Sequence, residues 1–318
     1  MRARRFMNNL HGILLVIAAM AGFTVEDMFI KQLSQTLPVG QILMLLGGAS
    51  AIVFAVLAGG RPLLARAAWR RPFLLRGLAE ALAAASFATA LSLVDISVVA
   101  AVFQATPLVV TMGAALFLGE PVGWRRWSAI GAGFAGVLLI IRPGLAGFEP
   151  AALLVLVAVV AVAARDLMTR RIDVAVSSFV VSFQGFAAML PTGALLLAAS
   201  GAAPRLPGAA EGAMIVAAVA FGGASYYAMV RATRIADASV VTPFRYARLL
   251  FSLAVGIVVF AERPDAPTLL GAALVIATGL YTFLRERQLA RRAARAAVAI
   301  GGEPARGAAS QTAARSTP

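Results

Sequence analysis

The chain has 318 residues, of which 61% are hydrophobic and only 13% are charged, whereas about a quarter of the residues of a soluble domain carry charge. Its formal net charge is +14, and it contains no cysteine and a single histidine. The lack of cysteine excludes disulfides, thiolate catalysis and thiolate metal sites. The high hydrophobic and low charged fractions predict a membrane protein. We expect it to hold neither a metal nor a cofactor.

Uncharged apolar runs follow one another along most of the chain. Each is long enough to cross a hydrocarbon core about 30 Å thick. Because the runs are rich in Ala, Leu, Val and Gly and lack an alternating pattern, they predict helices and not barrel strands. The expected fold class is an all-α polytopic membrane protein with ten transmembrane helices. Their expected ranges are 10–30, 39–58, 73–93, 96–118, 125–142, 150–168, 177–199, 211–230, 239–260 and 267–285.

Most of the arginines lie in alternate connections between the predicted helices. With the N-terminus in the cytoplasm, the connections on the outer side hold only Lys31, Arg142, Arg205 and Arg263. Cytoplasmic connections of membrane proteins carry an excess of Lys and Arg. Both termini are therefore expected in the cytoplasm, with the chain in a cell membrane, the bacterial inner membrane. The positive charge is thus an orientation signal, and no nucleic-acid partner is expected.

The two halves of the chain repeat each other, without a gap between the stretches 90–121 and 232–263. The predicted first repeat covers 8–142 and the second covers 150–285, with five helices in each. Since five is an odd number, the second copy enters the membrane from the opposite side, as in many secondary transporters. The matched residues are Asp95 with Asp237, Ser97 with Ser239, Glu120 with Glu262 and, in an earlier part of the repeats, Asp27 with Asp166 and Glu26 with Arg165.

Three further features of the chain are less specific. Residues 286–318 are rich in Ala, Arg, Gly and Ser, and we expect a basic, disordered cytoplasmic tail, whose first Arg-rich turn alternatively extends the last helix along anionic headgroups. Glu120 and Glu262, at matched helix ends, are expected to fix loops and not to bind substrate. Small residues line one face of several predicted helices, which favours close packing within the monomer or, as a second interpretation, a homodimer seam. The glycines concerned are Gly113, Gly119, Gly131, Gly133, Gly136, Gly271 and Gly279.

Several motifs lie at defined places in the two repeats. They are Arg76-Gly77, Phe103-Gln-Ala-Thr-Pro107, Leu118-Gly-Glu120-Pro, Trp124-Arg-Arg-Trp127 and Gly136-Val-Leu-Leu-Ile-Ile-Arg142-Pro143 in the first repeat, and Thr242-Pro-Phe-Arg245-Tyr-Ala-Arg248-Leu-Leu-Phe251 and Glu262-Arg-Pro264 in the second. In these motifs the chain resembles the EamA-type transporters of the drug/metabolite transporter superfamily. The resemblance covers roughly residues 8–285 and both repeats.

The resemblance implies ten helices, an inverted pseudo-two-fold repeat, and transport of a small metabolite by alternating access. The Phe-Arg-Tyr-x-Arg-Leu variant resembles a subgroup whose proposed substrates are S-adenosylmethionine, riboflavin and amino acids. Two positions depart from the family pattern. Leu46 stands where many relatives have an arginine in the second helix, and Glu80 is unusual in the third.

Ionisable groups inside membrane helices are costly, so each is a candidate functional residue. Depth along the helices, at about 1.5 Å per residue, puts Glu80, Arg165, Arg245 and Arg248 in one layer of the inner half. Arg245 and Arg248 share a helix face, with Tyr246 beside them. Two interpretations remain open and are compatible. One is a cationic clamp for a carboxylate or phosphate, and the other is a buried ion pair of the arginines with Glu80.

Glu26 and Asp27 lie near the outer end of the first predicted helix. A carboxylate in a dehydrated cavity can exchange protons near neutral pH, so this pair is the candidate for proton coupling. The alternative is that both side chains reach the outer headgroups. Gln104, near mid-depth before Pro107, either lines a cavity or bonds a neighbouring helix. Phe103 and Tyr226 either stack a planar substrate or pack the helices.

The leading functional hypothesis is a secondary active transporter for a small polar or anionic metabolite, with the substrate bound between the repeats. No phosphate-binding loop of the Gly-x-x-x-x-Gly-Lys-Ser/Thr type is present, so direct ATP drive is not expected. The alternatives are a lipid-modifying membrane enzyme and a receptor or scaffold without substrate flux. Because His11 is the only histidine, a catalytic cluster is not expected, and we predict that the chain is not an enzyme.

Overall fold

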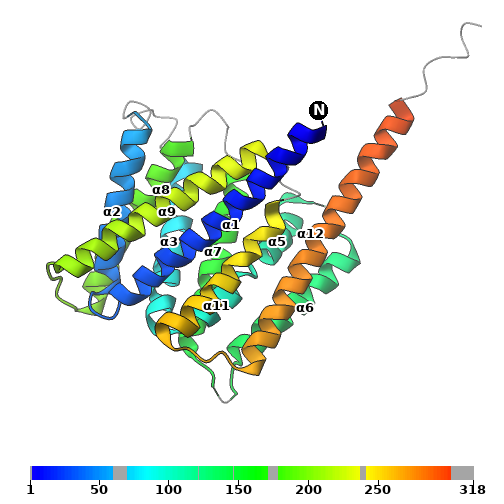
Figure 1. The fold of residues 1–318 in the computed structure, drawn as a ribbon. Coiled ribbons are helices and arrows are strands. Elements are labelled where there is room, and N and C mark those ends of the chain that lie inside the picture. Colours follow the sequence, from blue (N-terminus) through cyan, green and yellow to red (C-terminus); the bar gives the residue numbers. More distant parts are fainter. Residues whose placement is uncertain are drawn as a thin grey trace, which may run out of the picture.

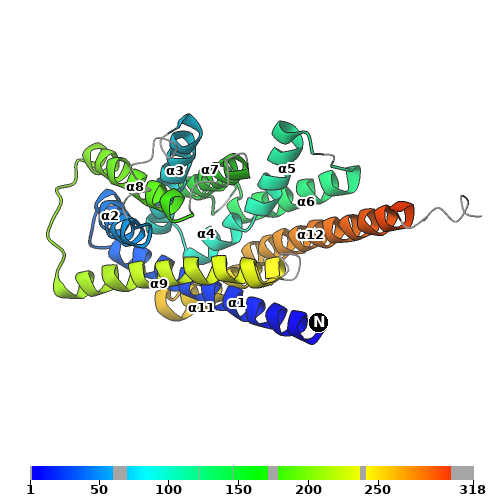
Figure 2. The same ribbon diagram turned by 90° about the horizontal axis from the view of Figure 1, so that it is seen from above.

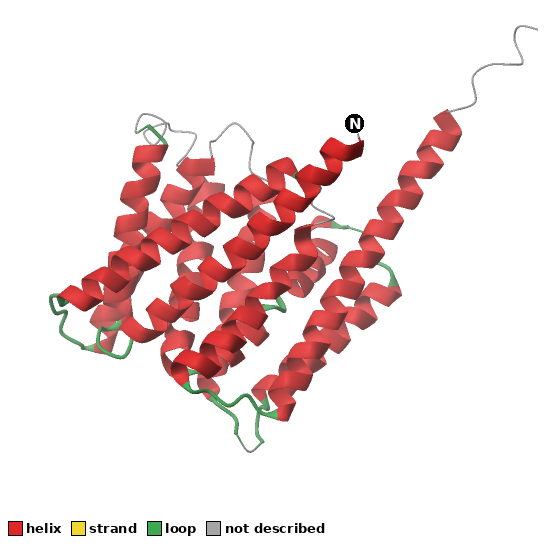
Figure 3. Ribbon diagram, viewed as in Figure 1, coloured by secondary structure: helices red, strands yellow, loops and turns green. Residues whose placement is uncertain are grey.

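The computed structural model describes residues 2–59, 70–120, 122–145, 147–170, 178–236 and 241–301. Within these ranges the regular structure is helical (Figure 3). The helices are α1 (Arg2–Leu33), α2 (Val39–Leu57), α3 (Arg71–Leu93), α4 (Ile96–Phe103), α5 (Thr106–Leu118), α6 (Trp124–Ile141), α7 (Leu153–Arg170), α8 (Ser178–Ser200), α9 (Ala209–Ile235), α11 (Ala247–Phe260) and α12 (Ala266–Gly301), with 3-10 turns η3 (Pro150–Ala152) and η4 (Thr242–Tyr246) (Figure 1).

The predicted all-α polytopic fold is confirmed. In the described part of the chain, 9 helical segments are long and apolar enough to cross a membrane, with α4 and α5 counted together as Ile96–Leu118. The tenth is α6, which has 18 residues. Its first turn reads Trp-Arg-Arg-Trp, so its mean hydropathy is lower than that of the others. It nevertheless packs along α12 in the same bundle.

The contacts between helices follow the pseudo-two-fold axis that the sequence repeat predicts. By the matched residues, α1 corresponds to α7, α3 to α9, and α5 to α11. The contact of α3 with α7 has its counterpart in α1 with α9, and the contact of α5 with α7 in α1 with α11. The pairs α2–α8 and α6–α12 each join two equivalent helices. In Figure 2, α4 lies between the layer of α1, α9 and α11 and the layer of α3 and α7.

Glycines bring both of these equivalent pairs into close contact. A Cβ on Gly136 of α6 would lie 2.9 Å from the carbonyl oxygen of Gly271 on α12, and a Cβ on Gly193 of α8 would meet the carbonyl oxygen of Gly40 on α2 at 2.5 Å. Small residues allow such backbone approach where no hydrophobic drive joins helices in lipid. These glycines therefore pack helices within the monomer, while the homodimer stays a prediction.

Replacing Gly136 with valine is expected to lower the free energy of unfolding by about 2 kcal/mol, because the new side chain overpacks the α6–α12 contact. Gly131→Val on the same helix is the matched control, since a Cβ at Gly131 would have no neighbour within 4 Å. Thermal unfolding of the purified protein in detergent compares the two. Equal losses for both variants would contradict this account of the contact.

Three predicted boundaries differ from the structure. The fourth predicted span, 96–118, is broken between α4 and α5 at Gln104 and Ala105. The ninth, 239–260, lies outside the described residues at its start, and a 3-10 turn precedes α11. The tail predicted as disordered from 286 onward continues α12 as helix to Gly301, because Ala and Arg are strong helix formers; residues 302–318 lie outside the described part.

Candidate functional site

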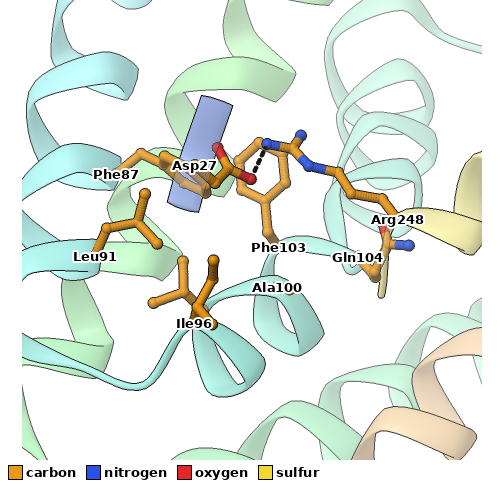
Figure 4. A pocket seen from close by; sticks show the side chains of 9 residues that line it. Asp27, Phe87, Leu91, Ile96, Ala100, Phe103, Gln104 and Arg248 are labelled. Carbon is orange, nitrogen blue, oxygen red and sulfur yellow. Dashed lines mark hydrogen bonds and ion pairs between the residues drawn. The ribbon is translucent and has the colours of Figure 1, made fainter. Parts of the chain in front are cut away.

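A small cavity lies where four helices meet near the middle of the bundle (Figure 4). It offers about 10 Å³ to the centre of a water molecule, which is the room that about one ordered water needs. A metabolite does not fit this volume in this conformation. The lining residues are Asp27 of α1, Phe87 and Leu91 of α3, Ile96, Val99, Ala100 and Phe103 of α4, Gln104, and Arg248 of α11.

An ion pair joins the two repeats across this cavity. A guanidinium nitrogen of Arg248 donates a hydrogen bond to Asp27 Oδ2 at 2.6 Å. The side chain of Asp27 is 6% exposed and that of Arg248 is 20% exposed. Removing one partner of such a buried pair leaves an uncompensated charge, which costs about 3–5 kcal/mol. Asp27 and Arg248 are therefore coupled, and a ligand that separates them has to compensate both.

Three phenylalanine rings surround the Arg248 guanidinium. Its central carbon lies 5.5 Å from the ring centroid of Phe23, 5.7 Å from that of Phe87 and 5.5 Å from that of Phe103. The rings of Phe87 and Phe103 also pack edge to face at 4.9 Å. Aromatic faces attract cations within about 6 Å of the centroid. The site thus combines one carboxylate with an aromatic cage for a cation.

The cavity lies at the helix break of the first repeat, and the second repeat is irregular at the matched place. Gln104, at the end of α4, corresponds to Tyr246, where η4 ends and α11 begins. The Gln104 side-chain amide donates to the backbone carbonyl oxygen of Arg245 at 3.5 Å, the long end of the hydrogen-bond range. Transporters with inverted repeats place substrate sites at such paired discontinuities.

Glu80 does not pair with Arg245 or Arg248, so this part of the predicted site is wrong. A guanidinium nitrogen of Arg165 on α7 donates to Glu80 Oε1 at 2.7 Å, and Arg76 lies 3.5 Å from Glu80 Oε2. Arg165 also donates to Asp166. The estimated depths of Glu80 and Arg165 agree with this pair. Depth alone does not fix the direction of a side chain around its helix, and Arg248 points to α1 instead.

Three other predicted site residues lie outside the cavity lining. Arg245 is exposed in η4, and only its backbone carbonyl approaches Gln104. Tyr246 is buried against Gly279 of α12, which has no side chain to occupy that space. Tyr226 accepts a hydrogen bond from Ser182 at 2.7 Å and packs on Phe54 of α2. Their predicted contact with substrate therefore stays a prediction.

Glu26 is next to Asp27 but faces α9. Its carboxyl group lies against Gly222, where a Cβ would come within 2.7 Å of Glu26 Oε2. Among the described residues, no hydrogen bond or ion pair joins this carboxyl group to another side chain. In the repeat, Glu26 corresponds to Arg165 and Gly222 to Glu80. The contact of Glu26 with Gly222 thus has the place of the Glu80–Arg165 ion pair, but Gly222 itself provides no charge.

Glu262 closes one end of the cavity region by capping α4. Its carboxylate accepts hydrogen bonds from the backbone N–H of Ile96 at 2.7 Å, from the N–H of Ser97 at 3.1 Å and from the Ser97 hydroxyl at 2.7 Å. Lys31 lies 3.7 Å from the carboxylate and donates to the carbonyl of Val94 at 2.6 Å. The expected loop-fixing role of Glu262 agrees with these contacts, which join the two repeats.

The Glu262 carboxylate also affects Asp95, in the loop before α4. Partial burial and, to a lesser extent, the charge of Glu262 raise the pKa of Asp95 above its usual range, while Lys31 opposes this effect. Because Ile96 both lines the cavity and donates to Glu262, movement of the cap changes the cavity wall directly.

Comparison with known proteins gives the family of the chain. A model of the EamA-like transporter family matches residues 10–142. A riboflavin transporter of Rhizobium johnstonii is 31% identical over 227 residues, which are 71% of this chain and 74% of the relative. The chain belongs to the EamA-like transporter family. Another relative, an S-adenosylmethionine uptake transporter of Rickettsia conorii, is 26% identical over 224 residues, 70% of this chain and 75% of its own.

A second riboflavin transporter and a solved structure are also similar to the chain. A riboflavin transporter of Vibrio cholerae is 29% identical over 192 residues, 60% of this chain and 64% of its own. A solved crystal structure with 21% identity covers 86% of this chain and 98% of its own, with a TM-score of 0.54. At that identity the likeness concerns the fold alone. As a member of this transporter family, the chain is a multi-pass membrane protein of the drug/metabolite transporter superfamily.

Leu46, where this EamA-family chain departs from the family pattern, has a packing role in the structure. Leu46 is buried with Leu33, Ile42 and Ala218 in an apolar cluster between α1, α2 and α9. The position therefore packs helices here.

Sequence reasoning missed two members of the aromatic cage, Phe23 and Phe87. Phenylalanine is common in apolar helices, so the sequence does not distinguish these two residues from their apolar neighbours. One signal was present for Phe23, which lies one helical turn before Asp27 and therefore on the same face of α1. Phe87 lies on α3, whose rotation about its axis follows only from its packing against neighbouring helices, mainly α7 and α8.

Proposed function

We propose that this EamA-family chain is a secondary active transporter that moves a small polar metabolite by alternating access, with the Asp27–Arg248 pair at its substrate site. The observation that carries this proposal is a charged, aromatic-lined cavity at the repeat-matched helix breaks. Its small volume corresponds to a closed state. The polar lining groups are a carboxylate, an amide and a guanidinium, which suit binding and not covalent catalysis, so we propose no enzymatic activity.

We also propose the orientation and the membrane. The distribution of Lys and Arg supports cytoplasmic termini, and the curated relatives described above are bacterial proteins, which supports the inner membrane. In this orientation the cap formed by Glu262, Ser97 and Lys31 lies on the outer side. The conformation is then closed to the outside by a contact between the two repeats, as alternating access requires of one of its states.

A variant of the cap tests whether it keeps the cavity closed to the outside. Glu262→Gln is expected to weaken the hydrogen bonds to α4 and shift the population toward the outward-open state. Because the chain has no cysteine, a single Leu91→Cys substitution reports on the cavity wall without background. Labelling of intact cells by a membrane-impermeant maleimide should be several-fold faster in the Glu262→Gln background.

The matched control is Glu149→Gln, at an exposed carboxylate in the loop before η3. It should leave the labelling rate of Leu91→Cys unchanged. Equal labelling with and without Glu262 would refute the role of the cap in closure.

Glu26 supports a proposal of proton coupling. It is a carboxyl group at membrane depth without an opposite charge bonded to it, which favours proton uptake, and it adjoins the substrate-site residue Asp27. A Glu26→Gln variant is expected to retain exchange of substrate between two equilibrated compartments, but to lose uptake driven by an imposed proton gradient. Proteoliposomes with and without a pH difference measure both. Gradient-driven uptake at the wild-type level would show that Glu26 does not carry the proton.

The experiment that tests the proposed function is counterflow in proteoliposomes. Vesicles are loaded with an unlabelled compound, and uptake of the same labelled compound is followed. The panel contains S-adenosylmethionine, riboflavin, amino acids and nucleotides. The proposal predicts transient accumulation of at least one of them, while an absence of accumulation for the whole panel would support a receptor or scaffold without flux.

A further inference from the structure

We propose that the substrate is a zwitterion, whose carboxylate takes the place of Asp27 at Arg248 and whose cationic centre takes the place of Arg248 at Asp27. This inference rests on the proposed transport function and narrows its substrate class. The starting point is that Asp27 and Arg248, which both line the cavity, already form an internal ion pair (Figure 4). The substrate thus has to exchange with a salt bridge and does not enter an empty pocket.

Charge compensation determines which substrates can make this exchange. Separation of Asp27 from Arg248 exposes one buried charge of each sign, and each needs a new partner. A neutral ligand provides none, a cation compensates only Asp27, and an anion compensates only Arg248. A zwitterion compensates both, so the buried charge balance of the site is the same before and after binding.

The aromatic cage refines the cationic half of the substrate. Phe23, Phe87 and Phe103 lie around the Arg248 guanidinium at 5.5–5.7 Å. Rings of this kind favour weakly hydrated cations, of which quaternary ammonium groups are the best-known case. A sulfonium ion likewise has a diffuse charge and no hydrogen-bond donor. When Arg248 turns toward the substrate carboxylate, such a cation can lie beside the rings and Asp27.

Arg248 is also suited to the other half of the exchange. Its guanidinium is a planar fork that matches a carboxylate with two hydrogen bonds, and in the closed state it uses one nitrogen on one Asp27 oxygen. The Gln104 amide, on the same side of the cavity (Figure 4), provides a further donor and acceptor for the polar remainder of the substrate.

The test uses compounds that share a skeleton and differ in charge. Counterflow of labelled S-adenosylmethionine is measured with competing 5′-methylthioadenosine, which lacks the sulfonium, the ammonium and the carboxylate, and with decarboxylated S-adenosylmethionine, which lacks only the carboxylate. Riboflavin is the neutral unrelated competitor, and glycine betaine is a small quaternary zwitterion. The two analogues and riboflavin are expected to compete about 100-fold more weakly than unlabelled S-adenosylmethionine, because a buried charge stays unpaired.

The outcomes separate this inference from the proposed function. If riboflavin or another neutral compound is transported and no zwitterion of the panel is, the zwitterion inference is wrong and transport stands. Equal competition by 5′-methylthioadenosine and S-adenosylmethionine also overturns it. If no compound shows counterflow, the proposed function fails, and the inference fails with it. Counterflow of S-adenosylmethionine, of glycine betaine or of an amino acid, with weak competition by the neutral compounds, supports it.

Ring variants test the aromatic cage separately. Phe23→Leu and Phe87→Leu keep an apolar side chain but remove the ring face. Each is expected to weaken binding of S-adenosylmethionine or glycine betaine by about 3- to 10-fold and to change the weak competition by 5′-methylthioadenosine little. Phe29→Leu is the control, since Phe29 lies on α1 but packs against Phe221 of α9. Equal effects on charged and neutral competitors in all three variants would contradict the cage.

Discussion

Replacement of Arg248 with glutamine is expected to reduce counterflow to below about 1% of the wild-type rate. The variant removes both the partner of Asp27 and the group proposed to bind the substrate carboxylate. It also leaves Asp27 buried without its partner, so the free energy of unfolding is expected to fall by about 3–5 kcal/mol. Counterflow in proteoliposomes and thermal unfolding in detergent measure the two effects.

A double variant separates stability from transport. Asp27→Asn with Arg248→Gln removes both charges and is expected to restore most of the lost stability, because no unpaired charge remains. Transport is expected to stay absent. A double variant that folds and transports at the wild-type rate would show that the ion pair is structural and that the substrate binds elsewhere.

Glu80→Gln is expected to have the largest effect on stability outside the cavity. It removes the carboxylate that pairs with Arg165 at 2.7 Å and lies beside Arg76, so two arginines at membrane depth lose a partner. The free energy of unfolding should fall by about 3 kcal/mol, with transport per folded molecule nearly unchanged. Denaturation of the purified protein in mixed micelles, together with counterflow, gives both values.

Glu149→Gln, at an exposed loop carboxylate, is the control for loss of a single negative charge and should unfold like the wild type. The opposite pattern for Glu80→Gln, with normal stability and lost transport, would indicate that Glu80 contacts the substrate and does not act as a structural link between α3 and α7.

Most of what could be predicted about the fold came from the sequence repeat between the two halves of the chain. Asp95, Ser97 and Glu120 match residues of the second half in sequence alone, and the helix contacts follow the pairing that such a repeat requires. These features depend on the order and composition of the chain, so they are visible before any packing is known.

The site was only partly predictable, because it depends on how the helices turn about their axes. Depth estimates put Asp27 in the outer half and Arg248 in the inner half, yet the two side chains meet at 2.6 Å. Helix α1 is tilted in the bundle (Figure 1), and an arginine side chain reaches several residues along its helix. Estimates of depth along the membrane normal ignore both effects. Glu80 was assigned the wrong partner because depth does not fix the direction of a side chain around its helix, although the estimated depths of Glu80 and Arg165 agreed.

The measurement that tests the account most directly is counterflow of S-adenosylmethionine or another zwitterion by the wild-type chain and by the Asp27→Asn, Arg248→Gln double variant in matched proteoliposomes. The account predicts accumulation with the wild type and none with an equally well folded double variant. Equal accumulation by the two proteins would contradict the assignment of the substrate site to this ion pair.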